Sequence, residues 1–251
     1  MSDNRPNILW LCTDQQRFDT LGCYGNPYVR TPHLDKLAAE GVRFAGAYCQ
    51  NPVCTPSRAS FLTGRYPRTC RTRQNGQDYA VCQTTERRIN DGYDYFAWSH
   101  GHGPAHEWML HEYALWLRRR GIEYAHPLRP DSRYVRIGMP PELHQSKWCA
   151  DCAMEFMDAA KREGRPWFFS LNWFDPHHAF DPPPEYLERY MDILDTLPLP
   201  NYDARELADK SPLVRRDHRG AYGKPGSFAY DDMTARDHRL IKAAYDAIID
   251  F

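Results

Sequence analysis

The sequence predicts an α/β fold with a mostly parallel central sheet flanked by helices. Short apolar segments alternate along the chain with longer segments of helical periodicity, which is the order typical of layered α/β domains. The 251 residues are enough for one large domain with a sizeable core. Ligands bind beyond the carboxyl ends of the strands in such sheets, so polar residues that follow strands are the first candidates for a site.

Three segments are expected to be strands. Residues 7–12 (NILWLC) and the stretch from residue 165 (RPWFFSLNWFDPHH) are nearly continuous apolar runs, as expected of strands buried on both faces. Residues 42–49 (VRFAGAYC) form the third expected strand. The first strand leads into Asp14 and the last into His177, so both residues are placed just past strand ends and are assigned to one site.

Helix signals mark much of the remaining chain. Thr31 is the expected N-cap of a helix with Pro32 at its first position and Gly41 just past its end. A second helix is expected to begin near Pro56. Further helices are expected over residues 107–120, over residues 146–164 and from Thr234 to the last residue. Residues 195–233 are rich in Pro, Asp and Arg with weak periodicity, which predicts a long loop.

Composition and charge argue against several classes of function. The formal net charge is −1, which gives no global basic field for nucleic acid. The first residues lack a basic n-region, and their apolar run is too short for a signal peptide or a membrane span. These observations predict a soluble, cytoplasmic protein with no membrane or nucleic-acid partner. The eight cysteines are expected to be reduced.

The segment PVCTPSRASFLTG contains the most informative pattern. Cys54 stands at the mouth of the expected second helix, where unpaired N–H groups and the helix dipole favour an anion. Arg58 follows four residues later, so the two side chains share a face, and its guanidinium could grip a tetrahedral oxyanion with two hydrogen bonds. The alternative is that Cys54 is a small buried apolar residue and Arg58 a surface charge.

Four stretches of the chain together resemble the sulfatases of the alkaline phosphatase superfamily. The signature Cys-x-Pro-Ser-Arg in the segment above is the first, and the others are RPNILWLCTDQQRFDTLGCYGN, RYPRTCRTRQNG and FDPHHAFDPPPEY, in the family's order. The resemblance covers most of residues 5–190 and implies an alkaline-phosphatase-like sheet. The Asp14-Gln15 pair, in place of Asp-Asp, is similar to the branch that includes phosphonate monoester hydrolases and phosphodiesterases.

The resemblance implies a chemistry for Cys54. In this family the motif cysteine is converted to formylglycine by a formylglycine-generating enzyme, and the hydrated aldehyde is a metal-bound nucleophile. Asp14, Gln15 and the modified Cys54 are the implied metal ligands. Ca²⁺ is the expected ion, with Mn²⁺ or Mg²⁺ as alternatives, because carboxylate and amide oxygens are hard donors. The residues alone leave Asp14 open to another role, as a turn or helix-capping residue.

The resemblance also assigns the remaining site residues. Arg58 would steady the transferred group, and His177 would donate a proton to the leaving group or contact the oxyanion. His178 is the neighbouring candidate for that role. Asn75 matches a substrate contact of the phosphonate hydrolase branch, and an Asn-Gly turn is its alternative. The expected substrate is a small sulfuric ester, and a phosphonate or phosphate ester is the alternative.

The sequence departs from the family in two places. A Gly-Lys-x-His motif that relatives carry is missing, which predicts an internal deletion near residues 77–83. Relatives are also longer at the carboxyl end, where they supply further metal ligands. Residues 1–251 are therefore expected to be the amino-terminal portion of a sulfatase-type catalytic domain. A catalytically defective fragment that only binds anions is a further alternative.

Several other patterns are expected to be structural. Cys149 and Cys152 have zinc-like spacing, but they fall inside an amphipathic helix and are expected to pack in the core. The dipeptides Asp217-His218 and Asp237-His238 resemble a metal pair of the family, but neither follows an apolar strand. His106 and His111 are five residues apart, so they diverge around a helix and do not match a zinc-binding helix motif.

Overall fold

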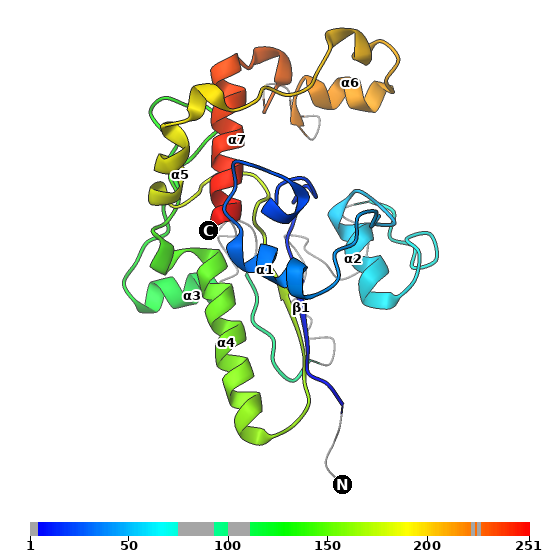
Figure 1. The fold of residues 1–251 in the computed structure, drawn as a ribbon, viewed down its shortest axis with the longest axis vertical. Helices are drawn as coiled ribbons and strands as arrows, with labels where there is room; N and C mark the ends of the chain where they lie inside the picture. The colour runs from blue at the N-terminus through cyan, green and yellow to red at the C-terminus, as the bar shows by residue number, and fades with distance from the viewer. Residues whose placement is uncertain (1–4, 75–92, 100–110, 222–223, 225–226) are drawn as a thin grey trace.

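A parallel pair of strands lies at the centre of the protein. The computed structural model describes residues 5–74, 93–99, 111–221, 224 and 227–251. Strand β1 (Ile8–Cys12) pairs with β2 (Phe168–Asn172) in a register that joins Ile8 to Phe168 and Cys12 to Asn172. Both strands therefore end at the same edge of the sheet. These two make up the sheet in the described part of the chain, in an α/β arrangement as predicted (Figure 1).

Seven α-helices surround the strands in the described residues, with α2 on one side of β1 and with α3 and α4 on the other (Figure 1). Their bounds are α1 (Pro32–Glu40), α2 (Cys54–Thr63), α3 (Glu112–Arg119), α4 (Gln145–Glu163), α5 (Pro184–Met191), α6 (Pro212–His218) and α7 (Ala235–Asp250). Short 3-10 helices are η1 (Gly22–Tyr24), η2 (Pro141–Leu143), η3 (Leu194–Thr196), η4 (Ala204–Leu207) and η6 (Tyr230–Asp232).

Local capping signals fix the ends of the long helices. The Thr234 hydroxyl accepts a hydrogen bond from the Asp237 amide, and the Asp237 side chain accepts one from the Thr234 amide, which is a complete capping box for α7. Helix α4 ends at Gly164, whose φ of 64° is readily adopted only by glycine. Thr31 does not cap α1 with its side chain. Its hydroxyl donates to Asp35 and accepts from the Gly22 amide instead. Thr31 is nevertheless the N-cap residue of α1, with Pro32 at the first position and Gly41 just past the end, as predicted.

Two apolar clusters hold the helices together. One lies between α5 and α7 and contains Val135, Leu187, Tyr190, Leu194, Leu197, Leu240, Ala243, Ala244 and Ala247. The other joins α3, α4 and β2 and contains Tyr113, Leu117, Met139, Trp148, Cys149, Ala153 and Leu171. Cys152 packs against this second cluster. Cys149 and Cys152 therefore pack in and against the core, as the sequence predicted.

Several expectations about the elements were wrong. Residues 42–49 form no strand, and Val42, Phe44 and Tyr48 are 81%, 69% and 91% exposed. Strand β1 is not buried on both faces, since its side chains from Ile8 to Leu11 are 41–50% exposed. The expected loop over 195–233 contains α6, and α5 lies in a segment for which no helix was predicted.

Among the described residues, every helix is too short or too polar to span a membrane.

Candidate functional site

The segments that follow β1 and β2 remain side by side beyond the sheet. The Trp173 amide donates to the Cys12 carbonyl at 2.8 Å, and the Asp14 amide donates to the Asp175 carbonyl at 3.1 Å. Backbone hydrogen bonds thus continue the parallel pairing past the last strand residues. Asp14 is held by this pairing at the carboxyl end of the strands, the edge at which α/β folds bind ligands.

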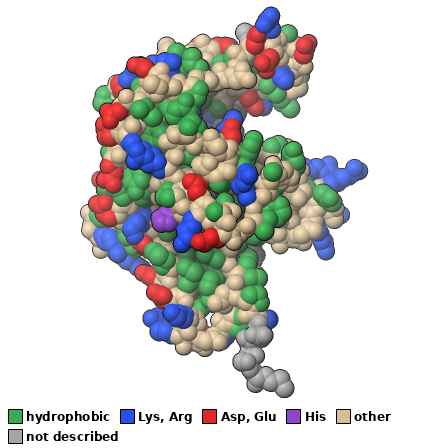
Figure 2. Space-filling model, in the orientation of Figure 1, with side chains coloured by type: hydrophobic (Ala, Val, Ile, Leu, Met, Phe, Trp, Pro, Cys, Tyr) green, Lys and Arg blue, Asp and Glu red, His purple; other side chains and the backbone are tan. Residues whose placement is uncertain are grey.

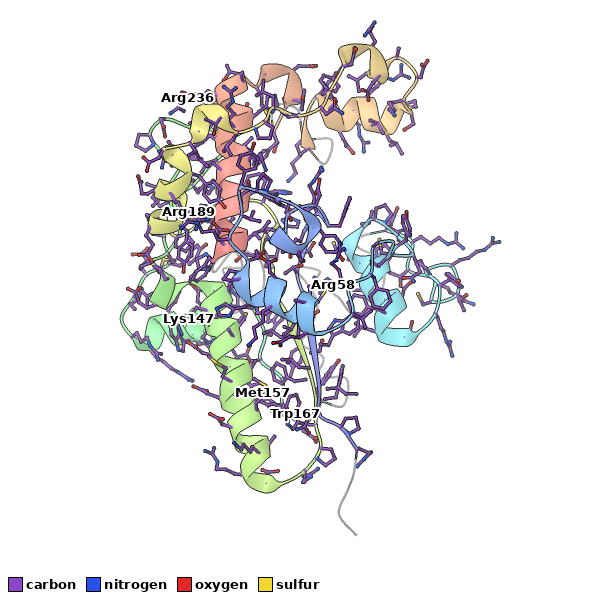
Figure 3. The ribbon with its side chains drawn as sticks, viewed as in Figure 1. Arg58, Lys147, Met157, Trp167, Arg189 and Arg236 are labelled. Carbon is purple, nitrogen blue, oxygen red and sulfur yellow. The ribbon has the colours of Figure 1, made fainter. Side chains whose placement is uncertain are left out.

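Arg58 connects helix α2 to this edge. Its Nη1 donates to Asn172 Oδ1 at 2.8 Å, and its Nη2 donates to Asp14 Oδ2 at 3.2 Å. The side chains of Arg58 and Asp14 are only 17% and 14% exposed. Arg58 is therefore fixed in the structure and is not a solvated surface charge. Figure 3 shows it between α2 and the paired strands.

Cys54 is the first residue of α2, two positions earlier than the expected start near Pro56. It is half-buried, and no side chain caps this end of the helix. Helical geometry places Arg58 about one turn beyond Cys54, on the same face. The sulfur thus lies at the positive end of the helix dipole, on the helix that Arg58 ties to Asp14.

Gln15 forms the turn after Asp14 with φ of 57°, in the left-handed region. Its side chain is exposed, whereas its backbone is tied to α7. The Tyr245 hydroxyl donates to the Gln15 carbonyl at 2.6 Å and accepts from the Arg17 amide at 2.9 Å. Burial raises the pKa of Tyr245, which keeps the phenol proton in place for this bond. No sequence pattern singled out Tyr245, which lies within the expected final helix.

His177 lies in the turn after β2 and is half-buried. Its amide donates to the Phe174 carbonyl at 3.1 Å, and its ring packs on Phe174 and His178 with centroid distances of 4.5 and 4.3 Å. Asp175 of the same turn is buried and is hydrogen-bonded to the Ser146 hydroxyl. His177 is thus two residues from the carbonyl that accepts from Asp14. Asn75 and residues 77–83 lie outside the described residues.

The described residues do not by themselves complete a site for a divalent cation. They contain no group of three or more His, Cys, Asp or Glu side chains placed to hold a metal ion. Asp14 offers one carboxylate, which already accepts from Arg58, whereas Ca²⁺ takes about six to eight oxygen ligands. His218 pairs with Asp231 at 3.2 Å, and Asp237 belongs to the capping box of α7. Neither Asp-His dipeptide therefore extends the ligand set.

Cys12 is the last residue of β1 and precedes Asp14 by two positions in the sequence. Burial raises its pKa, and the Arg58 cation partly opposes the increase by favouring the thiolate. Arg58 thus acts electrostatically on the strand end as well as through its hydrogen bonds.

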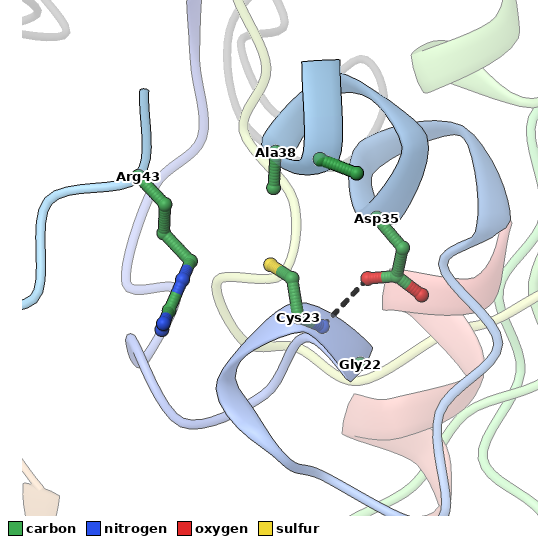
Figure 4. Close-up of a pocket in the computed structure, with 6 residues that line it drawn as sticks. Gly22, Cys23, Asp35, Ala38 and Arg43 are labelled. Carbon is green, nitrogen blue, oxygen red and sulfur yellow. Dashed lines mark hydrogen bonds between the residues drawn. The ribbon is translucent and has the colours of Figure 1, made fainter. Parts of the chain in front are cut away.

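Two cavities of the structure lie away from the Arg58–Asp14 ion pair. The first, of about 410 Å³, lies between η1 and α1 and is lined by Gly22, Cys23, Asp35, Ala38, Ala39 and Arg43. There the Cys23 amide donates to Asp35 at 2.7 Å, which ties η1 to α1 (Figure 4). The second, of about 420 Å³, includes Met157 and Trp167 and lies near the opposite ends of the strands (Figure 3). Neither cavity is lined by a candidate site residue.

Comparison with known proteins identifies relatives along most of the chain. The family model described as "Sulfatase" matches residues 6–206. An uncharacterized sulfatase, YidJ, of Escherichia coli is 27% identical over 98% of this chain and 52% of its own length. An ulvan-active sulfatase of Formosa agariphila is 30% identical over 80% of this chain and 42% of its own length.

Solved structures show the same fold. A phosphonate monoester hydrolase from Silicibacter pomeroyi superposes with a TM-score of 0.71 and 21% identity, over 98% of this chain and 56% of that chain. The phosphonate monoester hydrolase of Agrobacterium radiobacter gives a TM-score of 0.66 at 24% identity, with the same coverage of both chains. The chain thus spans about half the length of the relatives that it matches.

Proposed function

Since this chain belongs to the sulfatase family, we propose that it forms the amino-terminal portion of a catalytic domain that hydrolyses sulfuric esters. The observation that supports this most is the anchoring of α2 at the strand ends. Arg58 binds Asp14 and Asn172 from the helix that begins at Cys54, which gives one cation and one helix N-terminus for a sulfate group. The proposed substrate is a small molecule that carries a sulfuric ester.

Cys54 is the proposed nucleophile after conversion to formylglycine. A formylglycine-generating enzyme would recognise the Cys-Thr-Pro-Ser-Arg segment and oxidise the thiol carbon to an aldehyde, with loss of the sulfur and consumption of an oxidant. One hydroxyl of the hydrated aldehyde attacks the ester, and the other later expels the transferred group and regenerates the aldehyde. An unmodified thiol has no second hydroxyl and could not release its product by this route.

The neighbouring residues have distinct proposed roles. Arg58 would hold two oxygens of the transferred group, and His177 would give a proton to the leaving oxygen. Asn75 would contact the substrate. A divalent cation, with Ca²⁺ preferred over Mn²⁺ or Mg²⁺, would take Asp14, Gln15 and the modified Cys54 as part of its ligands and would polarise the ester. The rest of its ligands would come from outside the described residues.

A phosphonate monoester or phosphodiester hydrolase is the second candidate. The observation in its favour is the pair Asp14-Gln15, in which a neutral amide replaces a second carboxylate beside the proposed cation. A less negative ligand set leaves the site more positive, which suits a phosphonate or phosphate ester as well as a sulfate. The two candidates share the nucleophile and differ in the group transferred.

A substrate panel tests both candidates. The chain is co-expressed with a formylglycine-generating enzyme, and turnover of an aryl sulfate, a phenyl phosphonate monoester and an aryl phosphodiester is measured with added Ca²⁺ or Mn²⁺. The sulfate should be the best substrate, and Cys54→Ala should abolish its turnover. Preference for the phosphonate would support the second candidate. Turnover that survives Cys54→Ala would contradict both, because the nucleophile would lie elsewhere.

A longer form of the protein tests the proposal about the domain. Residues 1–251 alone should be a weak catalyst, because removal of one charge-stabilising contact typically costs about 100- to 1000-fold in rate. A protein extended to the length of its relatives should be faster by at least that factor. Equal turnover by the two forms would show that residues 1–251 hold a complete site.

A further inference from the structure

The second cavity lies between the end of helix α4 and the residues that lead into β1. Its volume of about 420 Å³ is within the range of about 300–1,000 Å³ that is typical of small-molecule sites. The Trp167 amide donates to the Asn7 side-chain oxygen at 3.2 Å, across 160 positions of sequence. This bond holds the two sides of the cavity together. We call this space, which Asn7, Met157 and Trp167 help to line, the α4–β1 cavity.

Cations from separate segments line the α4–β1 cavity. They are Arg5 before β1, Lys161 in the last turn of α4 and Arg165 just after the helix, and Asp158 is the one acid among the lining residues. Arg165 pairs with Glu163 at 3.8 Å, but their side chains are 76% and 65% exposed, so this pair holds the guanidinium only weakly. In Figure 2 blue side chains lie on both sides of the lower end of the molecule, where α4 ends and the chain enters β1. The wall of the cavity is therefore cationic.

The dipole of α4 explains only part of this charge. Cations in the last turn of a helix are stabilised by its negative end, and Lys161 and Arg162 are both in that turn. Arg162 is exposed and does not line the cavity. Arg5 and Arg165 lie outside the helix, and the dipole effect falls off beyond the last turn. Their convergence on one cavity from two segments favours an anion as their common partner.

The apolar part of the wall includes an aromatic ring with a hydrogen-bond donor. Met157 and Trp167 both line the cavity, and Figure 3 shows them close together near the end of α4. The Trp167 ring is half-buried and packs edge-on against Phe156, with a centroid distance of 6.0 Å. Its indole N–H has no acceptor in the described part of the chain. A ligand that fits this wall has a flat apolar part for the ring and oxygen atoms for the N–H group and the cations.

We propose that the α4–β1 cavity binds a small aromatic anion. The ring of the ligand packs on Trp167 and Met157, and its anionic group pairs with Arg165 and Lys161. A carboxylate and a sulfonate both meet these requirements, because each presents a pair of oxygens to a guanidinium. The cavity lies near the ends of the strands opposite to Asp14, so this site is separate from the candidate active site and does not depend on the proposed function.

Calorimetric titration of residues 1–251 with naphthoate tests the proposal. Naphthamide has the same rings without the charge, acetate has the charge without the rings, and naphthalenesulfonate has a different anionic group. The variant K161Q/R165Q removes two cations of the cavity. The matched control, R119Q/R162Q, removes two exposed cations that do not line it, one of them adjacent in sequence to Lys161.

Naphthoate should bind, and K161Q/R165Q should bind it about 10- to 50-fold more weakly, because two charged contacts are lost. The control should stay within about twofold, since changes at non-contact surface sites are small. Naphthamide and acetate should each bind at least about tenfold more weakly than naphthoate, because each lacks one half of the recognised structure. The order of naphthoate and naphthalenesulfonate identifies the anionic group that the cavity prefers, and either order agrees with the proposal.

The indole N–H resonance of Trp167 locates the bound ligand. It is assigned in NMR spectra by its absence from Trp167→Phe, and it should move as naphthoate is added to the unmodified sequence. Lack of binding at about 1 mM naphthoate would overturn the proposal, because a ligand of this size in a matching cavity should exceed that affinity. Equal losses in the two double variants, or a Trp167 resonance that stays in place while naphthoate binds, would also overturn it.

Discussion

Arg58 joins three segments that are far apart in the sequence: the turn after β1, the first half of α2 and the end of β2. It pairs with Asp14 and donates to Asn172 from a position that is 17% exposed. Removal of the guanidinium leaves a carboxylate that is only 14% exposed without its cation. Such a loss costs more than the loss of an exposed ion pair, because the remaining charge is partly desolvated.

We therefore expect Arg58→Met to lower the free energy of unfolding by about 2 kcal/mol. Arg17→Met is the control, because the Arg17–Asp19 pair has side chains that are 70% and 41% exposed and its loss should cost no more than about 0.5 kcal/mol. Urea titration of both variants measures the difference. Equal losses would mean that the Arg58 pair is as well solvated as a surface pair.

The Cys149 thiol gives a prediction for the pH dependence of stability. Burial raises its pKa from about 9 to about 12. Between these values the unfolded chain loses a proton that the folded chain keeps, so the free energy of unfolding falls as the pH rises through this window. Cys149→Ala should give a profile that falls less steeply, by up to about 1.4 kcal/mol per pH unit. Parallel profiles for the two proteins, measured by urea titration, would contradict the burial of this thiol.

At the scale of elements, α7 is linked to the candidate site by a single side chain. The Tyr245 hydroxyl bridges the Gln15 carbonyl and the Arg17 amide, across 230 and 228 positions of sequence. The turn that carries Asp14 is thus shaped by the last helix of the chain as well as by β1.

Tyr245→Phe should lower the free energy of unfolding by about 1–2 kcal/mol, because two hydrogen bonds to backbone groups are lost at once. The Arg17 amide should also exchange its hydrogen faster. Tyr48→Phe is the matched control, since Tyr48 is 91% exposed and should change little. Denaturation and hydrogen exchange measure both effects. Unchanged exchange at Arg17 would show that the bridge does not hold the turn.

Local signals in the sequence predicted some elements and not others, for physical reasons. Helix α1 was expected from Thr31 and Pro32 at its start and Gly41 just past its end, which act within one turn of the helix ends. Helices α4 and α7 were expected from their amphipathic periodicity, and the structure adds the Gly164 end of α4 and the Thr234–Asp237 capping box of α7. The strand expected over 42–49 was wrong, because a strand needs a partner that local sequence does not specify. Helix α6 does carry a cap signal, Ser211 followed by a proline, but the weak periodicity around it favoured a loop.

The candidate site was also predictable only in part. The rule for strand ends placed Asp14 at the edge of the sheet, because it follows an apolar run, and the resemblance to the sulfatases placed Arg58 in the same site. The structure joins the two by a hydrogen bond. Asn172 and Tyr245 were missed because their contacts with Arg58 and Gln15 connect residues 114 and 230 positions apart. Only the packed structure reveals contacts of this kind.

At the scale of the whole molecule, the central strands are poorly covered. The side chains of Ile8, Leu9, Trp10 and Leu11 are 41–50% exposed, and Phe168 is 53% exposed. A parallel sheet is normally covered on both faces. An apolar strand with an open edge and open faces favours association with other chains.

We expect residues 1–251 to self-associate as their concentration rises, and Leu9→Thr to reduce this association, because threonine keeps the strand and removes apolar surface. Leu213→Thr is the control, since Leu213 is 62% exposed but lies on α6, away from the sheet. Sedimentation velocity over a range of concentrations measures the effect. Equal changes in the two variants would show that general surface hydrophobicity, and not the strand, drives association.

The central claim is that Cys54 is the residue that becomes the nucleophile, and peptide mass spectrometry tests it most directly. Trypsin releases residues 44–58, which contain both Cys54 and the exposed Cys49. After co-expression with a formylglycine-generating enzyme, the fragment spectrum should show the aldehyde at Cys54 and an intact thiol at Cys49. An intact thiol at both positions, with conversion of a known substrate in the same cells, would contradict the claim.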